Sequence, residues 1–216
     1  MIRILSGAGR YADPYHDFAA TSARIARLAA TAGRRVEVVD DVEGGMADLA
    51  GVDLLVVNVG NPQPYGSESA GLGAARAGLA THLRGGGSLL ALHVSATSFP
   101  TVPEWEKILG GRWVRGRSMH PPYDHAHVLV NTDAHPIVHR IGDFSVWDER
   151  YSYLRISPQI RPLAHHRHEG ADHPLLWARE HEGARVVYDA LGHDERSYDS
   201  PEHQAILTAA MAWLVA

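Results

Sequence analysis

Residues 85–96 read GGGSLLALHVSA, so a glycine triplet is followed by an apolar run and then by His93. The run shows no polar–apolar alternation, which is typical of a strand buried on both faces of a parallel sheet. In open α/β sheets, ligands bind at the carboxyl ends of such strands. His93 is therefore the first candidate for chemistry. The alternative is a core histidine that makes a structural hydrogen bond at the end of its strand.

The chain before this strand alternates between strand and helix patterns. Short apolar runs bounded by turn residues predict strands, and apolar residues at helical spacing predict helices between them. Such alternation indicates βαβ units, so we expect an α/β fold with a three-layer, doubly wound, mostly parallel sheet of the flavodoxin-like type. The expected strands cover residues 2–6, 35–39, 53–58 and 88–92, the helices lie between Asp17 and Gly33 and over residues 67–84, and Gly44-Gly45 marks a loop.

Polar loops follow the expected parallel strands. Residues 7–17 follow the first strand, residues 58–66 follow the third, and the segment from His93 follows the fourth. Because parallel strands collect such loops on one side, these segments are expected to meet at one edge of the sheet, with His16 among them. The first loop contains a Gly-x-Gly pair but lacks the third glycine of a dinucleotide fingerprint, so we interpret the pair as a turn.

The second half of the chain is expected to be more elaborate. A short helix is predicted from Pro103 to Leu109, and residues 113–153 are rich in histidine, proline and aromatic residues. Residues 174–177 and 184–188 predict a hairpin, and a final amphipathic helix begins at Pro201. Because no repeat, low-complexity tract or linker interrupts the chain, residues 1–216 are expected to form one domain.

Composition excludes several classes of protein. The formal net charge of −5 gives no general attraction to nucleic acid or anionic membranes. No run of about 18 apolar residues is present, and Met1 leads directly into a strand, so we expect neither a transmembrane helix nor a signal peptide. The absence of cysteine excludes disulfides, thiolate nucleophiles and cysteine-ligated metals. These features favour a cytoplasmic protein.

An ordered series of motifs along the chain resembles the ThuA-like (trehalose utilisation) family. The series covers nearly the whole chain and is more specific than any one motif. It comprises Gly86-Gly87, Leu92-His93, Phe99, Trp105, Leu109-Gly110-Gly111, His120, His135-Pro136-Ile137, Asp148-Glu149-x-Tyr151, Pro174-Leu175-x-Trp177, Gly183-x-Arg185-Val186-x-Tyr188 and Leu191-Gly192-His193-Asp194. The resemblance implies a fold similar to class I glutamine amidotransferases and a role in the utilisation of trehalose or oxidised (keto) sugars.

The amidotransferase relationship does not extend to the reaction. Those enzymes place a cysteine on a sharp strand-to-helix elbow beside an activating histidine. Here the elbow position is expected to hold His93, and without cysteine a thiolate-dependent glutaminase is excluded. The segment from His93 to Ala96 does not supply a Gly-x-Ser-x-Gly nucleophile motif either. Ser95 and Ser98 are therefore expected to cap the following turn.

What remains is a site of histidines and carboxylates. His93 and His193 follow apolar strands, and Glu149 follows the apolar pair Val146-Trp147. A carboxylate beside an imidazole fixes its tautomer and raises its basicity, which general acid–base catalysis requires. The alternatives are a buried salt bridge or helix cap for Glu149 and a structural hydrogen bond for His193. Because the resemblance places both in family motifs, we favour His93, Glu149 and His193 as catalytic residues.

Other residues are candidates for contacts with substrate. They come from the loops expected beside the site, whereas the polar stretch His165-His166-x-His168 is interpreted as surface. One or two of Tyr15, Phe99, Trp105, Trp113 and Tyr151 are expected to form a stacking wall for a sugar ring. The proposed substrate-binding residues are His16, Ser95, His120, Tyr151 and Asp194.

The same residue types suit a divalent metal such as zinc. Catalytic zinc takes three ligands from His and Asp or Glu and leaves a fourth position open. His93, Glu149 and His193 are the candidate ligands, with His16 or His120 as a substitute. No short His-x-His or His-x-x-x-His pair lies among them, so a metal-free acid–base site remains the alternative.

Two classes of function stay open from the sequence. The first is an enzyme that acts on a disaccharide or keto-sugar by hydrolysis, isomerisation or elimination next to a carbonyl. The second is a non-catalytic sugar-binding or accessory protein with the same cleft. In both, the partner is a small carbohydrate. Trp113, Met119 and Tyr123 lie in a segment of little periodicity, which is typical of interfaces, so a homo-oligomer is expected.

Overall fold

The computed structural model describes residues 1–62, 66 and 68–216, and within them the strands form one large mixed sheet and one small sheet. The large sheet has the order β2-β1-β3-β4-β11-β10-β9-β6-β7, and the small one pairs β5 with β8. The strands are β1 (Ile2–Ser6), β2 (Val36–Val39), β3 (Leu54–Asn58), β4 (Ser88–Leu92), β5 (Gly111–Arg112), β6 (Asp124–Val130), β7 (Phe144–Asp148), β8 (Arg155–Ile156), β9 (Pro162–His168), β10 (Ala171–His181) and β11 (Ala184–Asp189).

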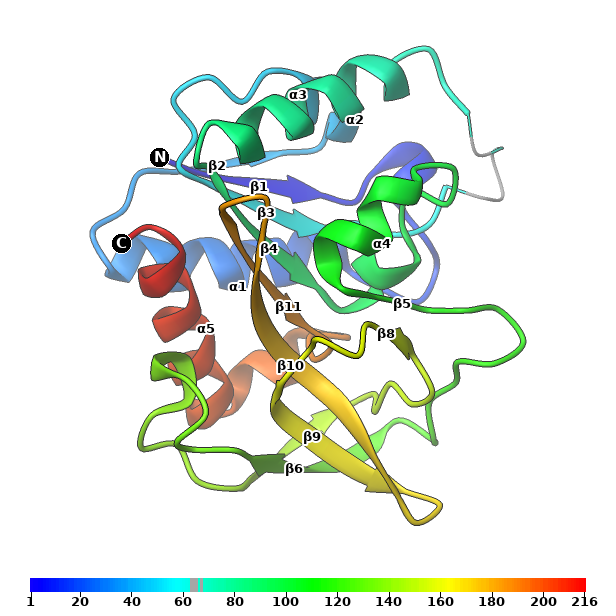
Figure 1. Cartoon of the computed structure of the whole chain (residues 1–216), viewed down its shortest axis with the longest axis vertical. Helices are drawn as coiled ribbons and strands as arrows, with labels where there is room; N and C mark the ends of the chain where they lie inside the picture. The colour runs from blue at the N-terminus through cyan, green and yellow to red at the C-terminus, as the bar shows by residue number, and fades with distance from the viewer. Residues whose placement is uncertain (63–65, 67) are drawn as a thin grey trace.

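Helices connect and cover these strands. Figure 1 shows α2 and α3 on one side of the parallel strands and α1 and α5 on the other. The α-helices are α1 (Phe18–Thr31), α2 (Val42–Ala47), α3 (Leu72–Arg84), α4 (Pro103–Leu109) and α5 (Pro201–Leu214), and the 3-10 helices are η1 (Gly9–Tyr11), η3 (His93–Thr97), η4 (Pro136–Val138) and η5 (Glu195–Asp199). None of the helices in the described ranges combines the length and the apolar character needed to cross a bilayer.

The parallel half of the sheet agrees with the sequence-based expectation. Strands β2, β1, β3, β4 and β11 run parallel, and every residue of β3 and β4 is buried. Strands covered on both faces need no polar alternation, which explains the continuous apolar runs. The result is a mixed α/β fold with helices, whereas its doubly wound connectivity stays a prediction.

Helix α2 corrects the expected loop at Gly44-Gly45. Asp41 caps the helix, because its side chain accepts a hydrogen bond from the backbone N–H of Gly44. An added Cβ at Gly45 would lie 2.9 Å from Cδ2 of Leu5 and 3.1 Å from Cγ1 of Val39. The glycine therefore lets this short helix lie directly against β1 and β2, so tertiary packing overrides the low helix propensity.

Helix α3 begins at Leu72, later than the expected start at residue 67. Ser67 itself lies outside the described residues, as do residues 63–65 of the loop expected over 58–66. Gly71 precedes the helix, and an added Cβ there would lie 2.4 Å from a carboxylate oxygen of Glu43 in α2. The close approach of α2 thus coincides with the first turn of α3.

The elaborated second half extends the sheet with antiparallel strands. The expected hairpin is confirmed as β10 and β11, joined at Glu182-Gly183, and β11 also pairs parallel to β4. Residues 113–153 contribute β6 and β7 near the far edge. Because β11 lies beside β4, the segment after Asp189 emerges next to His93.

A buried ion pair joins the end of β11 to α5. His203 Nε2 lies 2.9 Å from Oδ2 of Asp189, and both side chains are almost completely buried. Burial alone lowers the pKa of His203, but the charge of Asp189 and its hydrogen bond raise it on balance. Asp189 also accepts a hydrogen bond from the backbone N–H of Leu191, so the pair fixes the start of the segment that leads to His193.

The raised pKa of His203 predicts a pH-dependent stability. A histidine whose pKa is higher in the folded protein stabilises it fully below the unfolded value of about 6.5, and that contribution is lost as pH rises through the folded value. The unfolding free energy of the wild type should therefore fall above about pH 6.5 more steeply than that of His203→Gln. Urea unfolding across pH 5–9 measures both curves, and parallel curves would contradict this role of the pair.

Candidate active site

Three histidines meet at the carboxyl edge of the parallel strands. His16 precedes α1, His93 follows β4, and His193 follows β11. The ring centroid of His16 lies 5.1 Å from that of His93 and 4.8 Å from that of His193, and the His93 and His193 centroids are 5.5 Å apart. The expected meeting of the loop after β1 with His93 is confirmed. The loop after β3 joins them within its described part, where the N–H of Gly60 donates to the carbonyl of Tyr11.

His93 stands on a constrained elbow between β4 and η3. Its φ is 42°, in the left-handed region that residues other than glycine rarely adopt. The Tyr188 hydroxyl donates to the His93 carbonyl over 2.8 Å, and His93 Nδ1 lies 2.7 Å from the Ala190 carbonyl oxygen. Backbone strain of this kind persists only where the surroundings hold it, and it is common at functional sites.

The partner of Nδ1 determines the tautomer of His93. A carbonyl oxygen only accepts hydrogen bonds, so Nδ1 carries the hydrogen. In the neutral ring, the lone pair is then on Nε2, which lies 3.1 Å from the Tyr151 hydroxyl and 3.4 Å from Oε2 of Glu149. His93 is only 1% exposed, so this nitrogen faces the interior of the site.

Glu149 lies at the centre of the imidazoles. In addition to the His93 contact, its Oε1 lies 3.4 Å from Nδ1 of His193 and 3.4 Å from Nε2 of His120. Burial raises the pKa of Glu149, but the neighbouring His193 and His93 outweigh burial and hold that pKa well below its usual range. Burial lowers the pKa of His93, whereas Glu149 and Asp148 raise it on balance. The carboxyl group of Glu149 is therefore ionised.

Asp148 positions both Glu149 and the loop that carries His193. Its carboxylate is completely buried and accepts hydrogen bonds from three backbone N–H groups, at 2.8 Å from Glu149, 2.7 Å from Gly192 and 3.2 Å from His193. Gly192 allows this approach, since its φ is 116° and an added Cβ would lie 2.7 Å from the Tyr198 hydroxyl oxygen. This role could not be predicted from the sequence, where the one signal is that Asp148 ends a strand directly before Glu149.

Asp13 holds His16 in a similar way. His16 Nδ1 lies 2.7 and 2.9 Å from the two carboxylate oxygens of Asp13, while the buried Nε2 of His16 has no hydrogen-bond partner in the part of the chain that the structure describes. Burial lowers the pKa of His16 more than Asp13 raises it. A carboxylate partner fixes the hydrogen on Nδ1, so Nε2 presents a lone pair to the cluster. His16, expected to contact substrate, is thus part of the central group.

A cavity of about 430 Å³ opens onto this cluster. A second cavity of about 740 Å³ adjoins it and shares Tyr15, His16 and Trp113 among its walls. Of the aromatic residues expected to form a stacking wall, Tyr15, Trp113 and Tyr151 line the first cavity, whereas Phe99 and Trp105 belong to the core. The lining residues of the first cavity are Tyr15, His16, Val94, Thr97, Trp113, His120, Glu149, Tyr151 and His193.

Two expected contact residues lie away from the cavity lining. Ser95 is completely buried, and its hydroxyl has no hydrogen-bond partner among the described residues, so the expected capping by Ser95 is wrong. Asp194 caps η5 and pairs with Arg196. The expected capping by Ser98 is wrong, because its hydroxyl donates to the carbonyls of Val59 and Gly60 and so ties η3 to the loop after β3.

The histidine-rich strand β9 does not join the cluster. His166 is buried and lies 3.2 Å from the Ser152 hydroxyl and 3.2 Å from the Tyr151 carbonyl oxygen. Burial lowers its pKa to about 4, so the ring is neutral near pH 7. The interpretation of this stretch as surface is wrong for His166, which is a core histidine.

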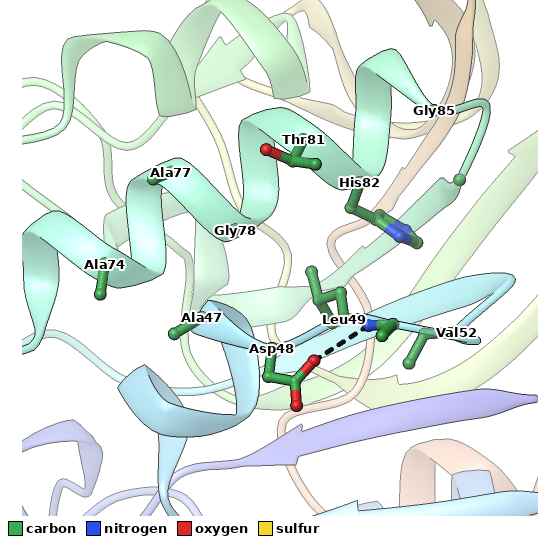
Figure 2. A pocket seen from close by; sticks show the side chains of 12 residues that line it. Ala47, Asp48, Leu49, Val52, Ala74, Ala77, Gly78, Thr81, His82 and Gly85 are labelled. Carbon is green, nitrogen blue, oxygen red and sulfur yellow. Dashed lines mark hydrogen bonds between the residues drawn. The ribbon is translucent and has the colours of Figure 1, made fainter.

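A further cavity of about 620 Å³ lies at the opposite ends of β3 and β4. Figure 2 shows it between α3 and the end of α2, where Gly78 and Ala47 lie close together. An added Cβ at Gly78 would be 2.3 Å from the Met46 carbonyl oxygen, so the helices are already in contact. The only histidine in this lining is His82, which bonds to the Ser88 carbonyl. Small side chains and one satisfied histidine make this cavity a weak candidate for chemistry.

Comparisons with known proteins identify relatives of the whole chain. The ThuA family model, described as trehalose utilisation, matches residues 6–214. No curated protein matches the chain. The family match spans His16, His93, Glu149 and His193.

Solved structures show the same fold at low sequence identity. A ThuA-like protein from Parabacteroides merdae has a TM-score of 0.81 at 16% identity, over 100% of this chain and 89% of that chain. One from Bacteroides uniformis has a TM-score of 0.77 at 17% identity, over 99% and 90%. A cytoplasmic protein from Salmonella typhimurium has a TM-score of 0.66 at 10% identity, over 99% and 98%. These likenesses concern the fold alone.

The contacts of Asp148 predict a specific loss on substitution. Asp148→Ala leaves the buried N–H groups of Gly192 and His193 without an acceptor, at about 1–3 kcal/mol for each. We expect the unfolding free energy to fall by at least about 2 kcal/mol and the amide hydrogens of both residues to exchange faster. Urea unfolding and hydrogen exchange measure the two effects. Asp199→Ala, which removes an exposed ion pair with Arg24, is the control and should cost about 1 kcal/mol or less. Equal losses in both variants would contradict the assigned role.

Proposed function

The chain belongs to the ThuA family, described as trehalose utilisation, and from this premise we propose that it is a carbohydrate-utilisation enzyme whose reaction centre is the cluster around Glu149. One observation carries the proposal: three imidazoles from different segments lie 3.4 Å from one carboxylate beside a cavity. A structural ion pair needs only one partner, so this convergence favours chemistry. The proposed substrate is a disaccharide or keto-sugar.

The cluster offers the two groups that chemistry next to a sugar carbonyl requires. The first is a positive charge, balanced by Glu149, that polarises the carbonyl or glycosidic oxygen. The second is an imidazole base that removes or returns a proton. His93, which is buried and paired with the Glu149 carboxylate, supplies the first. His193 lines the cavity and supplies the second.

Glu149 is better suited to hold charge than to act as the base. Its lowered pKa makes the carboxylate a weak proton acceptor near pH 7. It orients His93, His193 and His120 instead, each through its own 3.4 Å contact. His120 lies at the solvent side of the cavity and is the most exposed of the three, so it is placed to contact substrate.

The cavity walls suit a sugar ring. Trp113 and Tyr151 pack with centroids 4.6 Å apart, and both line the cavity together with the exposed ring of Tyr15. Aromatic faces of this kind provide apolar area beside polar groups, which ligand sites combine. The adjoining cavity has room for a second sugar unit. Tyr151 and His16, expected as contact residues, keep that role in the proposal.

The fold-level expectations extend the proposal. A doubly wound, class I glutamine amidotransferase-like arrangement places ligands at the carboxyl ends of parallel strands, where this cluster lies. The sequence has no cysteine at the His93 elbow or elsewhere, so the reaction is not thiolate-dependent. Cytoplasmic localisation and a homo-oligomer remain part of the proposal.

Turnover of a defined sugar panel tests the proposed function. We expect release of product from trehalose, other disaccharides or 3-keto-glycosides, and a loss of kcat of at least about 100-fold in His193→Gln, the range that general acid–base groups contribute. His127→Gln, on an exposed position of β6, is the matched control and should retain activity. Chromatography of the reaction products gives the measurement.

Two outcomes would overturn the proposal. Calorimetric sugar binding without product at any pH would make the chain a sugar-binding protein, the alternative from the sequence. Equal turnover in wild type, His193→Gln and His93→Gln would place the reaction elsewhere. Circular dichroism of each variant verifies that the fold is retained.

A further inference from the structure

The geometry points to a divalent transition-metal ion held by His16, His93, Glu149 and His193. Each residue offers one ligand atom, and these atoms all lie within 4.8 Å of one another. The inference deepens the proposed function because the ion lies at the same reaction centre. It does not require the substrate to be a sugar.

The lone pairs on the ring nitrogens of His93 and His16 favour a cation beside Glu149. The Ala190 carbonyl holds the hydrogen of His93 on Nδ1, and the Asp13 carboxylate holds that of His16 on Nδ1. In the neutral rings, both Nε2 atoms then present lone pairs toward the Glu149 carboxylate. Lone pairs and a carboxylate repel one another unless a proton, such as the one that gives His93 its positive charge in the metal-free protein, or a metal ion lies between them. A metal ion satisfies all of them together.

Two buried ring nitrogens of these histidines lack good hydrogen bonds from the described residues. Among the described residues, neither His16 Nε2 nor His193 Nδ1 finds a hydrogen-bond partner with good geometry, although both are buried and Nδ1 of His193 lies 3.4 Å from Oε1 of Glu149. Such atoms are rare in folded proteins and require an explanation, of which an ion is one. The side chains of His16 and His193 are only 10% and 13% exposed, so water does not readily replace the missing partner.

Two of the candidate histidine ligands are held in place by hydrogen bonds from their other ring nitrogen. Histidines that bind metals usually donate their other ring N–H to a carboxylate or backbone carbonyl, which fixes the ring. Asp13 does this for His16, and Ala190 does it for His93. Residues that only build a core have no need for two such arrangements directed at one point.

The distances suit the ion. Metal–ligand bonds of about 2.0–2.2 Å separate neighbouring ligands in a tetrahedral site by roughly 3.4 Å. His93 Nε2 lies 3.4 Å from Oε2 of Glu149, His193 Nδ1 lies 3.4 Å from Oε1, and the four ligand atoms lie within 4.8 Å of one another, so a small inward shift brings them to these separations. Imidazole and carboxylate ligands suit zinc and related first-row ions. With the ion in place, His193 is a ligand rather than the base, and His120 and Tyr151, which line the cavity beside it, are the groups for proton transfer and substrate contact.

Metal content and a spectroscopic titration test the inference. Protein purified without a histidine tag should contain about one equivalent of zinc by elemental analysis. After removal with a chelator, Co²⁺ should produce visible absorption bands of a low-coordinate site, and Zn²⁺ should displace it. Zinc should also raise the Tm of the apoprotein, because an ion that binds only the folded state stabilises it.

Two variants and one control test whether zinc binds at these four residues. Asp13→Asn keeps all four ligands but weakens the outer contact to His16, so zinc affinity should fall by about 10- to 100-fold. Glu149→Gln removes a ligand and should weaken binding further. His127→Gln, away from the cluster, should bind zinc as the wild type does. Calorimetric titration of each apoprotein with ZnCl₂ gives the affinities.

The outcomes separate this inference from the proposed function. Apoprotein that binds no zinc or Co²⁺, or that binds them equally well in Glu149→Gln, overturns the metal site even if sugars are turned over. Specific zinc binding that is lost in Glu149→Gln supports the site even if no sugar in the panel reacts. Full activity of chelator-treated protein leaves His93 and His193 as metal-free proton-transfer groups and also overturns the inference.

Discussion

A buried carboxylate needs compensation, and the arrangement of this site follows from that requirement. Glu149 is only 8% exposed, and an ionised carboxylate without partners is very unfavourable in such an environment. Its partners come from the segment after β4, from the loop after β11 and from residues 113–123 of the elaborated half. Each segment must be in place for the charge to be compensated, so Glu149 brings three separate segments of the chain together at one side chain.

The order of strands makes this convergence possible. β11 lies between β4 and the antiparallel half, so the loop with His193 emerges beside the His93 elbow. Asp148 at the end of β7 then binds that loop by two backbone hydrogen bonds. A strand from the edge of the large sheet and a strand from its middle are thus joined at the proposed reaction centre. The antiparallel extension is therefore part of the site as well as of the fold.

Much of the fold and part of the site could be predicted from sequence. The buried strands were recognisable because continuous apolar runs and their glycine boundaries are local signals. His93, Glu149 and His193 were recognisable because each follows a strand and falls within a family motif. Helix α2 was not, since the close approach of Gly45 to Leu5, which is distant in sequence, exists only in the folded chain. Asp13 and Asp148 were missed for the same reason: their importance comes from hydrogen bonds that exist only after folding.

A structure with bound sugar tests the central claim most directly. Crystals of Glu149→Gln soaked with trehalose or its 3-keto derivative would show where the ligand binds. The account predicts a sugar ring beside Trp113, with an oxygen within hydrogen-bond distance of His193 or His120. Well-ordered sugar in the cavity between α2 and α3, with the cluster at Glu149 left free of it, would contradict the assignment of the reaction centre.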